Sequence, residues 1–277
     1  TSPLHIDSLG TGFYQETDSF IRSDTLSAAL LSTWLQLFPK DAEGQDREKA
    51  IEQNILSKFC LSSAFPKITI LNAETKKQED IFYFLPRAAK TLAFQTKDAD
   101  STKRKAMKKI KWIESSLYIE SLQETFWQKE FKPLASEFML SSKQLKHFPE
   151  EFKAWHTSSN TRVSINRLST QAADGQLFEF ARLFYNDKKI GEKIFKTGLY
   201  FLVHLPENDK TTRTKFKAVL DVLGDSGIGG DRSSGHGLFE AEMMPSQLGL
   251  KAANPNQPAI GLSLCVPSDA ECKTLFE

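Results

Sequence analysis

The apolar residues of two segments recur with helical spacing. In the first, Ser23, Asp24 and Thr25 lead into a series that would occupy one helix face: Leu26, Ala29, Leu30, Thr33, Trp34 and Leu37. In the second, residues 212–223 are followed by Gly224, where glycine commonly ends a helix, and carry this apolar series: Phe216, Val219, Leu220 and Leu223. The pattern therefore predicts two amphipathic helices, one near each end of the chain.

Other segments have the short apolar or alternating patterns of β-strands. The ranges that favour strands are 81–85, 162–168, 177–185, 198–205, 238–243 and 260–266, with the end of a further strand at 3–6. The second half then has the order strand, strand, helix, strand, strand, which together with 162–168 approximates a ferredoxin-like arrangement. The first half can be interpreted as a looser copy of the same plan.

A domain boundary is expected near the middle of the chain. Pro149 and the polar stretch 156–160 lie between the two patterned halves. We therefore predict an α+β protein with two ferredoxin-like (RRM-like) domains. The first, residues 1–155, contains an inserted region, and the second, residues 156–277, carries a glycine-rich loop.

This glycine-rich loop, residues 224–237, contains six of the chain's 14 glycines. Glycine allows left-handed backbone and a close approach of main chain to another molecule, and one or two glycines already satisfy an ordinary turn. With Arg232, Ser233 and Ser234 between the glycines, the composition suits a phosphate or RNA-backbone cradle. The order helix, loop, strand and the lack of a Gly-Lys-Ser/Thr ending disfavour a mononucleotide site. A plain long turn is the structural alternative.

Two further segments could follow an RNA backbone. Residues 103–113 form a basic run that includes Lys108, Lys109 and Lys111 next to Trp112, although such runs are commonly solvated faces. In residues 162–167, alternation places Arg162, Ser164 and Asn166 on one strand face and Val163, Ile165 and Arg167 on the other. An ordinary half-exposed strand is the alternative. The start of the first helix, at Ser23, is a third candidate anion site.

Composition restricts the function classes only mildly. The net charge is +1, so RNA contacts would come from local patches, and 40% hydrophobic with 26% charged residues is typical of a globular protein. The cysteines Cys60, Cys265 and Cys272 form no metal-binding pair, so no metal or cofactor is expected and reduced thiols suggest the cytoplasm. There is no membrane-span pattern and no signal peptide. The chain starts at Thr1, and a preceding first strand is expected to be missing.

Catalysis by a histidine is the less favoured interpretation. The chain has five histidines, His5, His147, His156, His204 and His236. His236 lies inside the glycine loop, but between two glycines and with no ionisable partner at an obvious spacing. A stacking or hydrogen-bonding role is therefore the preferred interpretation.

Several segments resemble one known family. The segment from Ser226 to Glu240 closely resembles the C-terminal glycine-rich loop of RAMP proteins, the RNA-binding superfamily of CRISPR effectors. More narrowly, the chain resembles the fourth subunit of the type III-A (Csm) interference complex. The similar segments also include residues 20–30, 61–66, 108–113 and 162–167, with Ser27 where an aromatic residue is more usual.

The resemblance implies a non-catalytic RNA-binding subunit that caps the 5′ repeat-derived handle of the guide RNA. Its partners would be the large polymerase-like subunit and the repeating backbone subunit, with target RNA contacted indirectly and no membrane. The expected RNA-binding residues are Ser23, Asp24, Thr25, Lys108, Lys109, Lys111, Arg162, Ser164, Asn166, Arg167, Gly227, Gly229, Gly230, Arg232, Ser233, Ser234, Gly235, His236 and Gly237.

Two other functions remain open on the sequence. One is a guide-processing endoribonuclease of the same superfamily, which would use His236 or His5 with a lysine to activate a 2′-hydroxyl. The other is a protein-only scaffold whose glycine loop packs on a partner.

Overall fold

A computed structural model describes residues 2–7, 14–44, 46–93, 101–165, 172–246, 248–250 and 260–264. Its centre is a six-stranded sheet in the order β5-β4-β3-β2-β9-β8. The strands are β2 (Phe65–Asn72), β3 (Gln78–Pro86), β4 (Trp112–Glu114), β5 (Phe138–Met139), β8 (Asp187–Ile190) and β9 (Lys193–Tyr200). Neighbours are antiparallel except β4 and β5, which are parallel.

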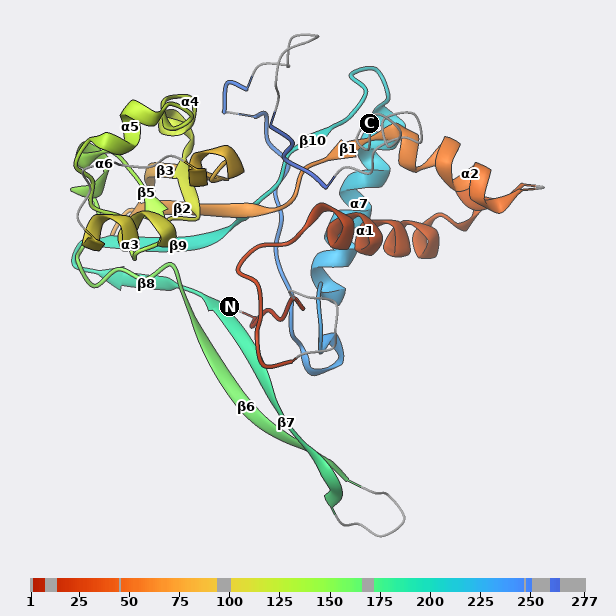
Figure 1. Ribbon diagram of the computed structural model, residues 1–277. Coiled ribbons are helices and arrows are strands. Elements are labelled where there is room, and N and C mark those ends of the chain that lie inside the picture. Colours follow the sequence, from red (N-terminus) through yellow and green to blue (C-terminus); the bar gives the residue numbers. More distant parts are fainter. Residues whose placement is uncertain are drawn as a thin grey trace, which may run out of the picture.

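Two further strand pairs lie outside this sheet. The short strands β1 (Cys60–Leu61) and β10 (Val203–His204) pair antiparallel. Strands β6 (Trp155–Ile165) and β7 (Ala172–Tyr185) form a long antiparallel hairpin that projects away from the rest of the molecule (Figure 1). The hairpin is also held beyond its base, where Leu4 bridges Leu183, Ala181 N donates to Tyr14 O and Arg162 pairs with Asp231.

The helices gather on two sides of the molecule (Figure 1). One side has α1 (Ser23–Leu37), α2 (Arg47–Asn54) and α7 (Lys210–Ser226), and the other has α3 (Ser101–Lys109), α4 (Tyr118–Ser121), α5 (Glu124–Gln128) and α6 (Ser142–Leu145). Short 3₁₀ turns are η1 (Pro39–Ala42), η2 (Leu56–Lys58), η3 (Ala89–Ala93), η4 (Ser115–Leu117) and η5 (Arg232–Ser234). None of the helices among the described residues is long and apolar enough to cross a membrane.

Two hydrophobic clusters hold these layers. One packs the sheet, through Ile68, Ile70 and Phe84, against the segment around Trp127. The other packs α1 on α7 and includes these fully or nearly buried side chains: Leu30, Trp34, Phe216, Val219 and Leu223. The two predicted amphipathic helices and their apolar stripes are therefore confirmed, except that Leu37, at the end of α1, is 38% exposed.

The strand predictions fared unevenly. The α+β class is confirmed, and the predicted strands at 81–85, 162–165 and 177–185 lie within β3, β6 and β7. The predictions for 238–243 and 260–264 were wrong, because these residues form no strand. The polar stretch 156–160, which was expected to lie between two domains, belongs to strand β6. Its polar side chains suit a projecting hairpin, where few core residues are available for packing. Residues 265 and 266 lie outside the described part.

The six-stranded sheet takes strands from both sides of the predicted boundary after residue 155. Strand β9, from the second half, pairs with β2 along its whole length, and β8 follows at the edge. The second hydrophobic cluster likewise joins α1 to α7. The division into units 1–155 and 156–277 stays a prediction, and these units share one sheet.

Candidate nucleic-acid interface

The glycine-rich loop begins where α7 ends and folds back on the N-terminal segment, residues 2–7. Gly227, with φ of 80°, donates its N–H to Leu223 O at 2.8 Å and terminates the helix. Gly230 N donates to His5 O at 2.9 Å, and Gly237 N donates to Pro3 O at 2.7 Å. The first residues of the chain are therefore bonded to the loop's backbone.

The glycines serve this internal packing. A Cβ on Gly229 would collide with the carbonyl of His5, and one on Gly237 would collide with the backbone of Ile228. The N–H groups of Gly227, Gly230, Gly235 and Gly237 are bonded within the chain, and the role of these glycines in RNA binding stays a prediction. The N–H groups of Gly230 and Gly237 bond to residues 3–5, a long-range contact that sequence spacing does not indicate, whereas those of Gly227 and Gly235 bond locally.

What the loop exposes is its tip. Arg232, Ser233 and Ser234 form the turn η5 and are exposed, as is Gly235 with φ of 79°. Asp231 stabilises this tip, because its Oδ1 accepts a hydrogen bond from Ser234 Oγ at 3.1 Å. Arg232 Nη1 also donates to Gly227 O at 3.4 Å, so the predicted cradle is a fixed turn whose exposed guanidinium and hydroxyls are partly bonded within the loop.

Asp231 also joins the loop to the hairpin. Its Oδ2 accepts from Arg162 Nη2 at 2.5 Å, and this hydrogen bond lowers the pKa of the Asp231 carboxyl. The same hydrogen bond raises the pKa of Arg162, whose guanidinium lies 4.6 Å from the centre of the Phe180 ring. Arg162 is therefore an internal tie, about one third exposed, and not a free strand cation.

Both histidines of the nuclease alternative lie in this junction and are buried. His5 is 2% exposed, with Nδ1 2.9 Å from Ala181 O and its ring 4.3 Å from that of Phe180. His236 is 5% exposed, and its Nδ1 lies 3.3 Å from Asp231 Oδ2 without hydrogen-bond geometry. Burial lowers the pKa of His236, against the opposing effect of Asp231. An attacking 2′-hydroxyl would have no direct access to either ring.

An exposed aromatic pair continues the same surface and was missed from the sequence. Tyr14 is 46% exposed and Phe178 is 37% exposed, with ring centroids 5.5 Å apart. Tyr14 also contacts Phe180, at 5.7 Å, and through it the Arg162 tie. The pair comes from two segments more than 160 residues apart, so no local pattern could have indicated it.

The start of α1 is occupied by the chain itself. Ser23 N donates to Ser63 Oγ at 3.0 Å, and Ser23 Oγ accepts from Leu264 N at 2.8 Å. Asp24 accepts from Thr25 N at 2.6 Å and leaves a carboxylate on the surface, which would repel phosphate. The anion site predicted here is therefore disfavoured, with Ser23 only 6% exposed.

The basic run divides into α3 and the beginning of β4. Lys108 and Lys109 are exposed, whereas Met107 and Ile110 face the core, so the run is a solvated helix face. Figure 1 shows α3 on the side of the molecule opposite α7 and its loop. The predicted RNA-binding residues therefore form separate groups. The side chain of Ser164, together with Asn166 and Arg167, lies outside the described residues.

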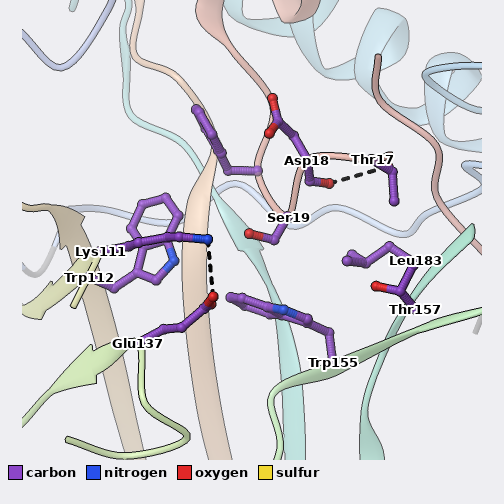
Figure 2. A pocket seen from close by; sticks show the side chains of 10 residues that line it. Thr17, Asp18, Ser19, Lys111, Trp112, Glu137, Trp155, Thr157 and Leu183 are labelled. Carbon is purple, nitrogen blue, oxygen red and sulfur yellow. Dashed lines mark hydrogen bonds and ion pairs between the residues drawn. The ribbon is translucent and has the colours of Figure 1, made fainter. Parts of the chain in front are cut away.

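A cavity of about 360 Å³ lies between these groups, at the base of the hairpin (Figure 2). Its lining residues come from the segment before α1, from β4 and β5, and from both hairpin strands: Thr17, Asp18, Ser19, Phe20, Lys111, Trp112, Glu137, Trp155, Thr157 and Leu183. Lys111 Nζ pairs with Glu137 Oε1 at 3.0 Å. Of this set the sequence indicated only Lys111 and its neighbour Trp112.

No group of three or more histidine, cysteine, aspartate or glutamate side chains among the described residues could hold an ion.

Comparisons with known proteins agree with the sequence resemblance. A relative from Methanocaldococcus jannaschii, named "CRISPR system Cms protein Csm4", is 25% identical over 256 residues, which cover 83% of this chain and 61% of the relative. This chain thus spans less than two thirds of that relative's length.

Two solved structures give partial overlays. The Csm3-Csm4 subcomplex of the type III-A CRISPR-Cas interference complex overlays with a TM-score of 0.49 at 16% identity, over 86% of this chain and 66% of that chain. The type III-B Cmr-beta complex bound to cognate target RNA and AMPPnP gives 0.33 at 12% identity, over 83% and 58%.

The sequence profile of the RAMP superfamily matches residues 1–240, which include the whole glycine-rich loop. The predicted resemblance is confirmed, and the chain belongs to the RAMP superfamily.

Proposed function

We propose that the chain is a non-catalytic RNA-binding subunit of a type III-A CRISPR ribonucleoprotein, in which it holds the 5′ repeat-derived handle of the guide RNA. Membership of the RAMP superfamily and the relative named Csm4 support this class of assembly. The observation that carries RNA binding is the surface where the glycine-rich loop meets the hairpin around Arg162 and Phe180. It combines the exposed turn Arg232–Ser234 with the exposed rings of Tyr14 and Phe178.

These groups match the two chemistries of single-stranded RNA. A guanidinium and two hydroxyls bind phosphate oxygens, and exposed aromatic rings stack on bases irrespective of sequence. Because the loop's glycines are bonded within the chain, the turn is fixed before RNA arrives, which lowers the entropy lost on binding.

The partner assignments belong to the same proposal. The chain would bridge the large polymerase-like subunit to the first backbone subunit, with target RNA contacted only through them. The projecting hairpin β6–β7 is the natural surface for one of these contacts. The plan of two ferredoxin-like units, 1–155 and 156–277, and a cytoplasmic location complete it. Co-purification of tagged chain with each subunit, with and without guide RNA, tests the bridge.

The nuclease alternative predicts a different result. Incubation of the purified chain with repeat RNA in EDTA would give site-specific cleavage that His236→Ala abolishes. The proposed function predicts binding without cleavage, which the burial of His5 and His236 supports.

The direct test is a matched pair of arginine variants. Arg232→Ala is expected to weaken binding of handle RNA several-fold. It is also expected to reduce the number of ions released on binding, read from the salt dependence of the affinity, by about one. Arg213→Ala removes the same charge from an exposed position in the first turn of α7 and is expected to leave both quantities unchanged. Fluorescence anisotropy over a range of salt concentrations measures them.

Equal losses from Arg232→Ala and Arg213→Ala would indicate general electrostatic attraction and count against the loop tip. RNA affinity that is absent, or independent of salt, would favour the protein-only scaffold instead.

A further inference from the structure

The cavity at the hairpin base has the size and the walls of a small ligand site. Its volume of about 360 Å³ is at the lower end of ligand pockets. Figure 2 shows Trp155 on one side, Lys111 with Trp112 on another, and Ser19 between them. The walls come from elements that are far apart in the chain, and the hairpin base and β4 fix them on sheet backbone.

Two buried polar atoms of the lining residues have no hydrogen bond among the described residues, Trp112 Nε1 and Asp18 Oδ2, and only the latter has an ion-pair partner, Arg22 at 3.3 Å. Trp112 is 3% exposed, and its Nε1 has no hydrogen bond among the described residues. Figure 2 shows that nitrogen on the side of the ring facing Trp155. Because an unpaired buried N–H is destabilising by about 1–3 kcal/mol, a ligand acceptor that reaches it would gain that interaction.

The other polar groups of the lining determine which hydrogen-bond donors and acceptors a ligand of this cavity would need. Lys111 Nζ and Glu137 Oε1, 3.0 Å apart, place a cationic donor beside an anionic acceptor. Trp155 is only partly buried and offers an aromatic ring. The carboxylates of Asp18 and Glu137 in the lining disfavour a phosphate group as the occupant.

We propose that this cavity binds one unstacked guanine of a single-stranded RNA. Guanine presents O6 beside the N1–H and N2–H donors, so O6 would accept from Lys111 or Trp112 while both donors bind the Glu137 carboxylate in parallel. Adenine and cytosine offer a single amino group to that carboxylate, and uracil offers one imide N–H, so each forms fewer charge-assisted bonds. Trp155 would stack on the base. This inference rests on the proposed RNA-binding function.

The experiment compares octauridylate with an otherwise identical RNA that carries one internal guanosine. The chain is expected to bind the guanosine RNA about tenfold more tightly than octauridylate. Replacement of that guanosine by inosine, which lacks the N2 amino group, or by adenosine is expected to remove most of the gain.

Two variants assign the gain to the cavity. Thr157→Trp, at an exposed position of β6 on the cavity rim, would fill the space, and Glu137→Gln would remove the carboxylate with little change of shape. Each is expected to abolish the guanosine gain while octauridylate affinity is retained. Ser159→Trp, two residues farther along β6 and also exposed, is the control and should keep the gain.

The failures are distinguishable. If wild-type protein binds both RNAs equally, or if Thr157→Trp and Glu137→Gln keep the gain, the guanine site is overturned while RNA binding stands. If neither RNA binds at low salt, the proposed function fails and the guanine site with it.

Discussion

At the scale of single residues, the glycine-rich loop is an internal joint with an exposed tip. Its glycines differ sharply in what surrounds them. Gly237, with φ of 73°, lies directly against the backbone of Ile228, whereas Gly235, with φ of 79°, has no neighbouring atom within 4 Å of a built Cβ. The same residue type at the same backbone angle therefore has two different roles two positions apart.

This difference predicts that alanine at Gly235 and alanine at Gly237 lower the free energy of unfolding by different amounts. Gly235→Ala is expected to lower the free energy of unfolding by about 1 kcal/mol, because only the left-handed backbone is penalised. Gly237→Ala is expected to lower it by more than about 2 kcal/mol, since the loop must also move away from Ile228. Urea denaturation measures both. Equal values for the two variants would contradict the internal role of Gly237.

The buried junction around Asp231 predicts acid sensitivity. Burial lowers the pKa of His236 below its ordinary value of 6.5, so the unfolded chain binds its proton more readily than the folded chain. The contribution of His236 to the free energy of unfolding is therefore complete above pH 6.5 and is lost as the pH falls through the pKa of the folded state. Asp231, with its pKa lowered by Arg162, adds a loss of the same sign at lower pH.

The free energy of unfolding should thus fall from pH 7.5 towards pH 5 in the wild type and fall less in His236→Gln. His204→Gln, at an exposed position of β10, is the control and should retain the wild-type slope. Denaturant titrations at each pH give the slopes, and a steeper fall in His236→Gln would refute the argument.

At the scale of elements, α1 and α7 are joined by a polar bridge as well as by their apolar stripes. Asp41, in η1, accepts from Trp34 Nε1 at 2.8 Å and from Lys215 Nζ at 2.7 Å. Although burial raises the pKa of Asp41, the hydrogen bonds from Lys215 and Trp34 lower it by more. The carboxylate of Asp41 thus connects α1, η1 and α7.

Asp41→Ala is expected to destabilise the fold by about 1–3 kcal/mol, because the buried Trp34 loses its indole partner. Asp221→Ala removes a carboxylate from the exposed pair with Lys217 within α7 and should change stability by no more than about 0.5 kcal/mol. Thermal unfolding of both variants tests this, and a similar effect of the two would show that the bridge adds nothing.

Local periodicity was sufficient for the helices and insufficient for the site. The stripe of α7 is set by spacing within one element, so Phe216 and Val219 could be placed from sequence. The hydrogen bond of the Gly230 N–H depends on His5, more than 200 residues away, and the aromatic pair joins Tyr14 to Phe178. Strand predictions failed at 238–243, where alternation occurs without a neighbouring strand to pair with. Contacts between distant segments thus mark the limit of prediction from sequence.

At the scale of the whole molecule, the two halves of the chain complete each other. Strand β2 of the first half depends on β9 of the second for one edge, and α1 depends on α7 for its apolar face. The cluster of α1 and α7 is therefore incomplete in either half, and the sheet cluster, which lies almost wholly in the first half, loses Phe195 and the strand β9.

Separately expressed 1–155 and 156–277 are accordingly expected to show no cooperative unfolding, and mixing them should restore it. Circular dichroism during denaturant titration follows the transition. A cooperative transition in 156–277 alone would establish that the second unit folds independently.

The bonding of residues 2–5 to the glycine loop has a consequence for biosynthesis. Ser2 donates to the carbonyl of Gly235, a partner 233 positions later. Until Gly235 has been synthesised Ser2 lacks this acceptor, and the segment can be held only by its contacts with β7, such as the bond from Leu4 N to Leu183 O. The loop therefore closes late, after its own residues have been synthesised. The turn proposed to bind RNA is fixed only at that stage.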